Sequence, residues 1–173
     1  MRERRENRRE RCRGVRRRRE RSGLDCEEEP TGPGRGYGDG LALDHGWVFE
    51  VPAAATGLVD AVPLKAMGRF NHEAACVDPA TGVIYLTEDR GDSVLYRFVP
   101  KTPGRLHDGG QLQAMVVDGL ADTRNWSAPD MPVGASYPVR WIDCDDVEAP
   151  ADDLRHRSAA RGAALASFAA SSS

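Results

Sequence analysis

The chain has 173 residues with 24 basic and 27 acidic side chains, a formal net charge of −3 and a mean hydropathy of −0.54. No apolar stretch reaches the length of a membrane span, which excludes a helical membrane protein. Four Cys without a Cys-x-x-Cys pair exclude the usual zinc-binding spacings.

The N-terminal segment differs from the rest of the chain. Its first 22 residues hold 12 Arg and 4 Glu, a local net charge of +8, whereas the remainder has 12 basic and 23 acidic residues. Such a segment cannot bury a core. We expect residues 1–23 to form a low-complexity basic segment that is either disordered or helical, because Arg and Glu are both good helix formers.

Three explanations compete for the Arg run. A basic arm would bind nucleic acid or anionic lipid. A secretory or twin-arginine signal would need a following apolar stretch, which this sequence lacks. A wrongly assigned start codon or a shifted reading frame in the gene would also produce an Arg-rich sequence of this kind. We favour the third, since no aromatic residues are interleaved for base stacking.

The body of the chain, residues 24–150, has the pattern of β-strands. HGWVFEV predicts a strand with Trp47 in the core. Apolar runs at 74–77 and 83–86 flank the turn sequence DPATG and predict a hairpin. The alternation in SVLYRFV, residues 93–99, adds a third strand, so we expect an antiparallel β-meander.

Further strands are predicted at 112–117 and in VRWIDC, which begins at Val139. A helix is predicted over 152–168, where acids suit its N-terminus and Gly162 weakens it. Residues 151–173 are therefore expected to form a C-terminal helix with a frayed tail.

Polar clusters stand at the ends of the predicted hairpin strands. His72 and Glu73 open the first strand, and Glu88, Asp89 and Arg90 follow the second. We expect both sets at one mouth of the sheet. Carboxylates gathered in this way suit calcium or magnesium, because like charges repel unless cations or water separate them. Solvated turn residues are the alternative, and the pattern alone leaves both open.

Several strings resemble consecutive parts of the PhoX family of bacterial alkaline phosphatases. They are CEEEPTGPG, HGWVFEVP, PLKAMGRFNHEAACVDPATG, VIYLTEDRGDSVLYRFVP and VRWIDCDDVEAPADDLRHRSAARGAA, which together cover about residues 24 to 165. The resemblance implies a secreted β-propeller enzyme that cleaves phosphate monoesters with calcium and iron.

The resemblance also implies roles for individual residues. Metal ligands would be Cys26, Glu27, Glu28, Glu73, Glu88 and Asp89, and candidates for pairing with phosphate oxygens are Arg90 and Arg97. Many relatives have the sequence GDD at the position where this chain has TED. Glu88 and Asp89 are the two acids of that TED sequence. Thiolate and carboxylates suit iron and calcium, and such cations can polarise phosphoryl oxygens.

The length limits this interpretation. A propeller has four to eight four-stranded blades, and the chain can supply about two or three. We therefore expect a mainly β fold, a partial β-propeller, and a truncated fragment that is inactive alone and whose open edges favour aggregation. Relatives are exported, but the absence of an export signal here predicts a cytoplasmic chain. The alternatives are a non-catalytic β-propeller binding protein and a nucleic-acid-binding protein that uses the basic tail.

Overall fold

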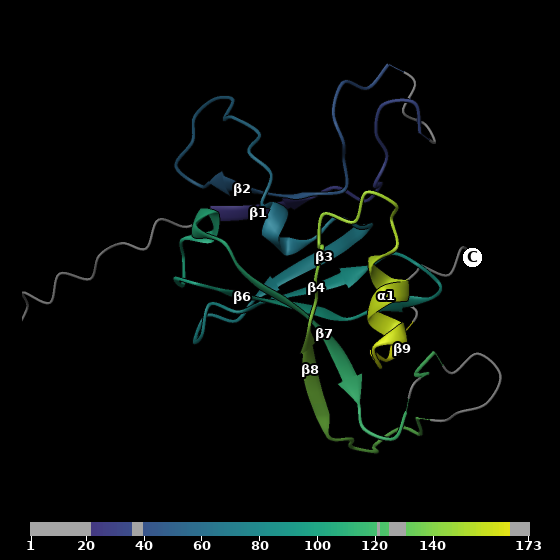
Figure 1. The fold of residues 1–173 in the computed structure, drawn as a ribbon. Helices are drawn as coiled ribbons and strands as arrows, with labels where there is room; N and C mark the ends of the chain where they lie inside the picture. The colour runs from purple at the N-terminus through teal and green to yellow at the C-terminus, as the bar shows by residue number, and fades with distance from the viewer. Residues whose placement is uncertain (1–21, 36–39, 121, 125–130, 167–173) are drawn as a thin grey trace, which may run out of the picture.

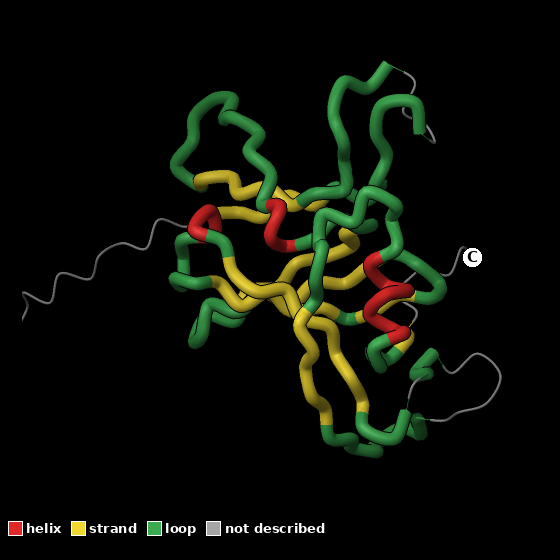
Figure 2. Tube along the Cα trace, in the orientation of Figure 1, coloured by secondary structure: helices red, strands yellow, loops and turns green. Residues whose placement is uncertain are grey.

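The computed structural model describes residues 22–35, 40–120, 122–124 and 131–166, which form a mainly β structure with one short α-helix (Figures 1 and 2). The strands are β1 Ser22–Cys26, β2 Val48–Pro52, β3 His72–Val77, β4 Ile84–Glu88, β5 Ser93–Val94, β6 Tyr96–Pro100, β7 Gly110–Val117, β8 Val139–Asp143 and β9 Leu165–Ala166. The helical elements are the 3₁₀ turns η1 Lys65–Met67 and η2 Leu106–Asp108, and the helix α1 Leu154–Ala160.

A five-stranded antiparallel sheet, called the main sheet below, has the order β3-β4-β6-β7-β8. Its first hairpin is the one predicted from the sequence. The turn is fixed locally, because the Asp78 carboxylate accepts hydrogen bonds from the Ala80 amide at 2.9 Å and from the Thr81 hydroxyl at 2.6 Å. Two smaller sheets pair β1 with β2 and β5 with β9.

The predicted third strand of the meander is divided in two. β5 leaves the main sheet and pairs with β9, whereas β6 lies between β4 and β7. Leu95 separates the two strands, and its carbonyl still accepts a hydrogen bond from the Met115 amide at 2.9 Å. The expectation of one continuous strand over 93–99 was wrong because its first two residues have a partner from the far end of the chain.

The core lies on one face of the main sheet. Side chains alternate along β6, where Tyr96 and Phe98 are fully buried and Arg97 points to the other face. Met67 of η1, Phe70 of the loop that follows it and Leu154 of α1 belong to the same buried core cluster as Tyr96 and Phe98. α1 lies beside the sheets in Figure 1. The prediction that Trp47 belongs to the core is confirmed, since it is 5% exposed.

The C-terminal helix is shorter than predicted. It spans Leu154–Ala160 instead of reaching residue 168. Gly162 has φ +98°, and the Ala163 amide closes the helix end by donating to the Ser158 carbonyl at 2.9 Å. A left-handed glycine of this kind ends a helix. The chain then forms β9, so the prediction was wrong beyond residue 160, and residues 167 and 168 lie outside the described part.

The mainly β fold with antiparallel pairing is confirmed. The predicted disordered or helical segment falls almost entirely on residues 1–21, which lie outside the described residues. Of the two cysteines in the main sheet and the segment that follows it, Cys76 is exposed on β3 and Cys144 is buried. In the described part of the chain, no helix has the length and apolar character needed to cross a membrane.

Candidate functional site

The three acid-bearing segments meet at one end of the β3–β4 hairpin. His72 and Glu88 are direct cross-strand partners. The His72 amide donates to the Glu27 carbonyl at 3.1 Å, and the Asp89 amide donates to the Asn71 carbonyl at 3.0 Å. Segments 26–28, 72–73 and 88–90 are therefore brought to one place, although they are far apart in the sequence.

Glu73 occupies a β-bulge. His72 pairs with Glu88 and the next pair is Ala74 with Thr87, so Glu73 is the extra residue on β3. Its side chain is exposed. Bulges re-aim side chains and are common beside active sites. This placement gives Glu73 an open carboxylate at the end of the hairpin, next to the segment that carries Cys26.

Glu27 holds the loop that enters β2. Its Oε1 lies 2.7 Å from His45 Nδ1, and its Oε2 accepts hydrogen bonds from the amides of Gly46 at 2.8 Å and Trp47 at 3.1 Å. Gly46 has φ +96°, and an added Cβ would lie 2.7 Å from Pro30, so only glycine fits there. The carboxylate thus has a defined structural task.

We expect Glu27→Ala to lower the free energy of unfolding by about 2–3 kcal/mol, because it removes a carboxylate that satisfies two backbone amides and a histidine. Urea unfolding followed by circular dichroism measures this change. The exposed neighbour Glu29 provides the control, and Glu29→Ala should change stability by less than about 0.5 kcal/mol. Equal effects of the two variants would contradict the structural role of Glu27.

Cys26 is half-buried at the end of β1. Burial raises the pKa of its thiol, and the charges of Asp25 and Glu28 raise it further. The thiol form is therefore favoured until a cation stabilises the thiolate. Glu28 is exposed beside it.

Glu88 is the buried carboxylate of the site. Its side chain is 1% exposed and neither oxygen makes a well-formed hydrogen bond to the described residues. The nearest cation is Arg155, whose Nη1 lies 3.6 Å from Oε1. Burial raises the pKa of Glu88 to about 7, and the attraction of Arg155 lowers it by less than burial raises it.

A layer of charged residues surrounds Glu88. Arg90 donates to Asn71 Oδ1 through Nε at 3.0 Å and Nη2 at 2.6 Å, and to Asp152 at 2.9 Å. Arg155 lies within 3.7 Å of both Asp92 and Asp152. The sequence did not identify Asn71, Asp152 or Arg155, because they become neighbours of Glu88 only through tertiary packing.

His72 and Arg97 have different surroundings. His72 is fully buried against Phe70, with ring centroids 3.7 Å apart, and burial lowers its pKa to about 4. Arg97 lies on the opposite face of the main sheet, where its Nε donates to Gln113 at 2.7 Å. The structure therefore brings Arg90 to the site and places Arg97 elsewhere.

The predicted ligands have suitable chemistry but do not form a complete metal site. Within the described ranges, no three His, Cys, Asp or Glu side chains are grouped closely enough to hold a metal ion. Cys26, Glu73 and Glu88 place a thiol, an open carboxylate and a buried carboxylate without a well-formed hydrogen bond at one end of the hairpin. Their donor types are ones that iron and calcium accept.

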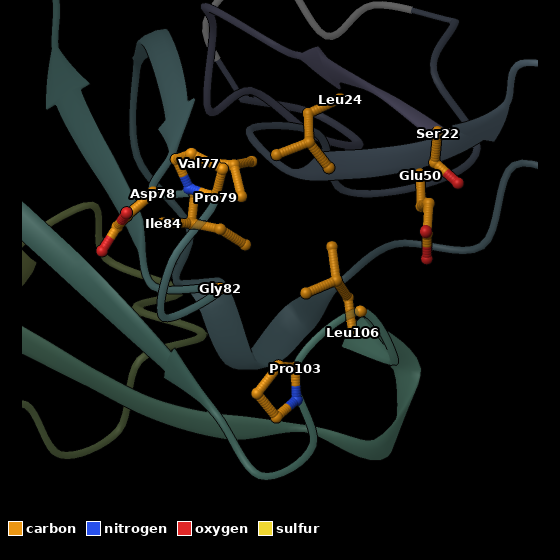
Figure 3. Close-up of a pocket in the computed structure, with 11 residues that line it drawn as sticks. Ser22, Leu24, Glu50, Val77, Asp78, Pro79, Gly82, Ile84, Pro103 and Leu106 are labelled. Atoms are coloured by element: carbon orange, nitrogen blue, oxygen red, sulfur yellow. The ribbon is translucent and has the colours of Figure 1, made fainter. Parts of the chain in front are cut away.

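A pocket of about 150 Å³ lies at the opposite, turn end of the hairpin (Figure 3). Apolar side chains from three segments, including Leu24, Ile84 and Leu106, line it, with the carboxylates of Glu50 and Asp78 at its margins. None of the predicted site residues is among its lining residues, so the pocket is separate from the acidic end of the hairpin.

The comparisons with known proteins agree with the resemblance. A family model described as alkaline phosphatase PhoX matches residues 4–170, a wider span than the expected 24–165. No curated protein matches the chain.

Among solved structures, Pseudomonas fluorescens PhoX, determined in complex with vanadate, a transition-state analogue, is similar with a TM-score of 0.51 and 20% identity. The alignment covers 83% of this chain and 34% of that one, so this chain spans about a third of the length of that relative. The likeness supports the expected propeller-type fold, and the number of blades stays a prediction. Because the family model matches nearly the whole sequence, the chain belongs to the PhoX alkaline phosphatase family.

Proposed function

We propose that this chain carries part of the metal centre of a PhoX-type phosphatase that hydrolyses phosphate monoesters with calcium and iron. The observation that supports this most strongly is the meeting of segments 26–28, 72–73 and 88–90 at one end of the β3–β4 hairpin. Family membership supports the reaction class, and this meeting point supports the proposed location of the centre.

The proposed ligands divide by chemistry. The thiolate of Cys26 with the carboxylates of Glu27 and Glu28 suits iron, and carboxylates such as Glu73, Glu88 and Asp89 suit calcium. Cations bound there would polarise the phosphoryl oxygens and stabilise charge that develops on the leaving group. A nearby cation would also lower the raised pKa values of Cys26 and Glu88, so both side chains would be anionic when the site is loaded.

Arg90 is the arginine that we propose for contact with a phosphate oxygen. Its hydrogen bonds to Asn71 and Asp152 use Nε and Nη2, which fixes the guanidinium plane. Nη1 makes none of these bonds, so it can donate to an anion. The same role for Arg97 remains a prediction, and its contacts with Gln113 and Trp141 favour a different one.

We further propose that the chain is a fragment with an incomplete centre. It spans 34% of the similar PhoX chain, and its described residues group no three ligands closely enough to hold a metal ion. The remaining ligands would come from segments outside this sequence. We therefore expect the chain alone to hydrolyse no p-nitrophenyl phosphate, even with calcium and ferric iron present.

Metal titration tests the proposed ligands directly. We expect weak binding of calcium and iron by isothermal titration calorimetry, weakened further by at least about tenfold in Glu73→Gln and Cys26→Ser, because each removes a ligand. Asp60→Asn serves as the matched control, since Asp60 is an exposed acid in the loop between β2 and η1 and is not one of the proposed ligands.

Two results would contradict the proposal in different ways. Metal binding that is equal in the ligand variants and in Asp60→Asn would exclude Glu73 and Cys26 as ligands. Phosphatase activity of the chain alone, abolished by the same substitutions, would support the reaction but contradict an incomplete centre.

A further inference from the structure

Arg155 is a nearly buried cation that lies among three carboxylates. It is the second residue of α1, and its side chain is 12% exposed. Its Nη1 lies 3.6 Å from Glu88 Oε1 and 3.5 Å from Asp152 Oδ1, and its Nε lies 3.7 Å from Asp92 Oδ1. The three acids come from the end of β4, the turn before β5 and the loop before α1. One guanidinium group therefore faces acids from three segments.

The contacts of Arg155 with these carboxylates are electrostatic and not hydrogen-bonded. Within the described part of the chain, both Glu88 oxygens and Arg155 Nε are buried without a hydrogen-bond partner. Arg155 Nη1 donates instead to the Asp152 carbonyl at 3.2 Å. Arg90 differs, because hydrogen bonds to Asn71 and Asp152 fix it. Arg155 can therefore move away from Glu88 without breaking a hydrogen bond to that carboxylate.

Glu88 is the acid that most needs a nearby cation. Its side chain is 1% exposed, whereas those of Asp92 and Asp152 are 40% and 28% exposed, so water screens the charges of the latter two. Removing one member of a buried ion pair is strongly destabilising, because it leaves an uncompensated charge. The three acids would also repel a phosphate group, so the surroundings of Arg155 suit a counter-ion and not a substrate contact.

The fold fixes the start of the helix that carries Arg155. Leu154, directly before it, belongs to the buried core, and Ser158, about one turn later, is 4% exposed. Asp152 has φ +52°, a left-handed conformation that Asp tolerates better than most residues. Its carboxylate accepts a hydrogen bond from Arg90 at 2.9 Å. Strained backbone of this kind is typical of functional sites, and here it sets the entry to α1.

We infer that Arg155 is the resident counter-ion of Glu88 in the cation-free chain and gives way when a divalent cation binds this carboxylate. The inference rests on the proposed function, in which Glu88 is a calcium ligand. A tethered positive charge and a divalent cation at short range repel each other, so the presence of one weakens the hold of the other on Glu88. Arg155 is thus a positioning residue, which keeps the acids together until the cation arrives.

A double-mutant cycle without metal tests the counter-ion role. Thermal unfolding is followed by circular dichroism with a chelator at about pH 8.5, above the pKa of about 7 to which burial raises Glu88. Arg155→Met should lower the midpoint temperature by about 6–12 °C in the wild-type background, because it leaves a buried carboxylate unpaired. In the Glu88→Gln background, where the buried charge is absent, it should lower the midpoint by less than about 3 °C.

Two further variants sharpen the cycle. Arg155→Lys keeps the charge and should lose less than half as much stability as Arg155→Met, since the contact with Glu88 does not use the planar guanidinium fork. Arg157→Met is the matched control, because it removes the same charge from the same helix, where Arg157 pairs with Asp153 at 3.0 Å. Its cost should be equal in the wild-type and Glu88→Gln backgrounds.

Calcium titration tests the exchange. Calcium chloride is titrated into each folded variant by isothermal titration calorimetry, with sodium chloride at equal ionic strength as the blank. Arg155→Met should bind calcium at least about tenfold more tightly than wild type, because the competing charge is gone. Arg157→Met should change the affinity by less than about twofold, since Arg157 is partly exposed. A side chain with only a structural role would give no gain in affinity.

The two experiments separate this inference from the proposed function. Equal costs of Arg155→Met in the two backgrounds would overturn the counter-ion role, and calcium binding that is equal or weaker in Arg155→Met would overturn the exchange. Calcium binding that is unchanged in Glu88→Gln would contradict the proposed ligand, and with it the exchange, while the metal-free cycle still decides the counter-ion role. If Arg155→Met does not fold, Arg155→Gln removes the same charge in both experiments.

Discussion

Replacing Arg69 with Ala is expected to lower the free energy of unfolding by about 3–5 kcal/mol. Arg69 is 1% exposed. Its guanidinium donates to the carbonyls of His45 at 2.7 Å, Pro30 at 2.7 Å and Thr31 at 2.9 Å, with a longer contact to Ala149 at 3.4 Å. A single side chain therefore joins three loops that are distant in the sequence.

The expected cost comes from the acceptors that remain. Without Arg69, the part-buried carbonyls of Pro30, Thr31 and His45 lose a charged donor. Each unsatisfied group costs about 1–3 kcal/mol unless water reaches it. Arg69→Lys should recover less than half of the loss, because an ammonium group cannot reproduce the planar fork of a guanidinium. These loops also carry the residues that Glu27 holds, so the acidic end of the hairpin should loosen with them.

Urea unfolding measures the effect, with Arg105→Ala as the control for losing an exposed arginine. The control should cost less than about 0.5 kcal/mol. If Arg69→Ala is too unstable to purify, Arg69→Lys gives the measurement, and a stability equal to wild type would show that the carbonyl contacts contribute little.

The parts of the fold that depend on local signals were predictable from the sequence. The β3–β4 hairpin follows from DPATG, because the Asp78 side chain closes its own turn. The buried positions of β6 and β7 follow from alternation. The division of the third strand was not predictable, since β5 pairs with β9 more than 70 residues away and no local pattern encodes that partner.

In the candidate site, too, the features set by local sequence were predictable and those set by contacts between distant segments were not. Placing His72 near Glu88 required only a hairpin with the correct register. The engagement of Glu27 with His45, and the approach of Arg155 to Glu88, depend on contacts between separate segments. The family resemblance gave chemical roles to residues of the site, but it gave no indication that Arg69 holds the adjacent loops together.

Glu88→Gln is expected to show a pH dependence of stability that is nearly absent in the wild type, where the contributions of His72 and Glu88 cancel. His72 and Glu88 are buried cross-strand partners with opposite pKa shifts. Burial lowers the pKa of His72 from 6.5 to about 4 and raises that of Glu88 from 4.5 to about 7. Each shift corresponds to about 3 kcal/mol across its range.

The two contributions have opposite signs. Between pH 6.5 and about 4 the unfolded chain binds a proton at His72 that the folded chain does not, so this residue makes stability fall as pH falls. Between pH 4.5 and about 7 the folded chain keeps a proton on Glu88 that the unfolded chain loses, so this residue makes stability rise as pH falls. Over their shared range the two effects nearly cancel.

Each single variant should expose the effect of the remaining partner. Relative to wild type, Glu88→Gln should lose about 3 kcal/mol between pH 6.5 and 4, and His72→Gln should gain about 3 kcal/mol between pH 7 and 4.5. Urea unfolding at several pH values, with a chelator to exclude cations from Glu88, gives both slopes. Variants whose profiles run parallel to wild type would show that neither proton equilibrium is shifted by folding. Opposite slopes would establish that desolvation shifts the pKa values of both His72 and Glu88 in the folded chain. A cation bound at this end of the hairpin would then have to lower a pKa of Glu88 that burial has already raised.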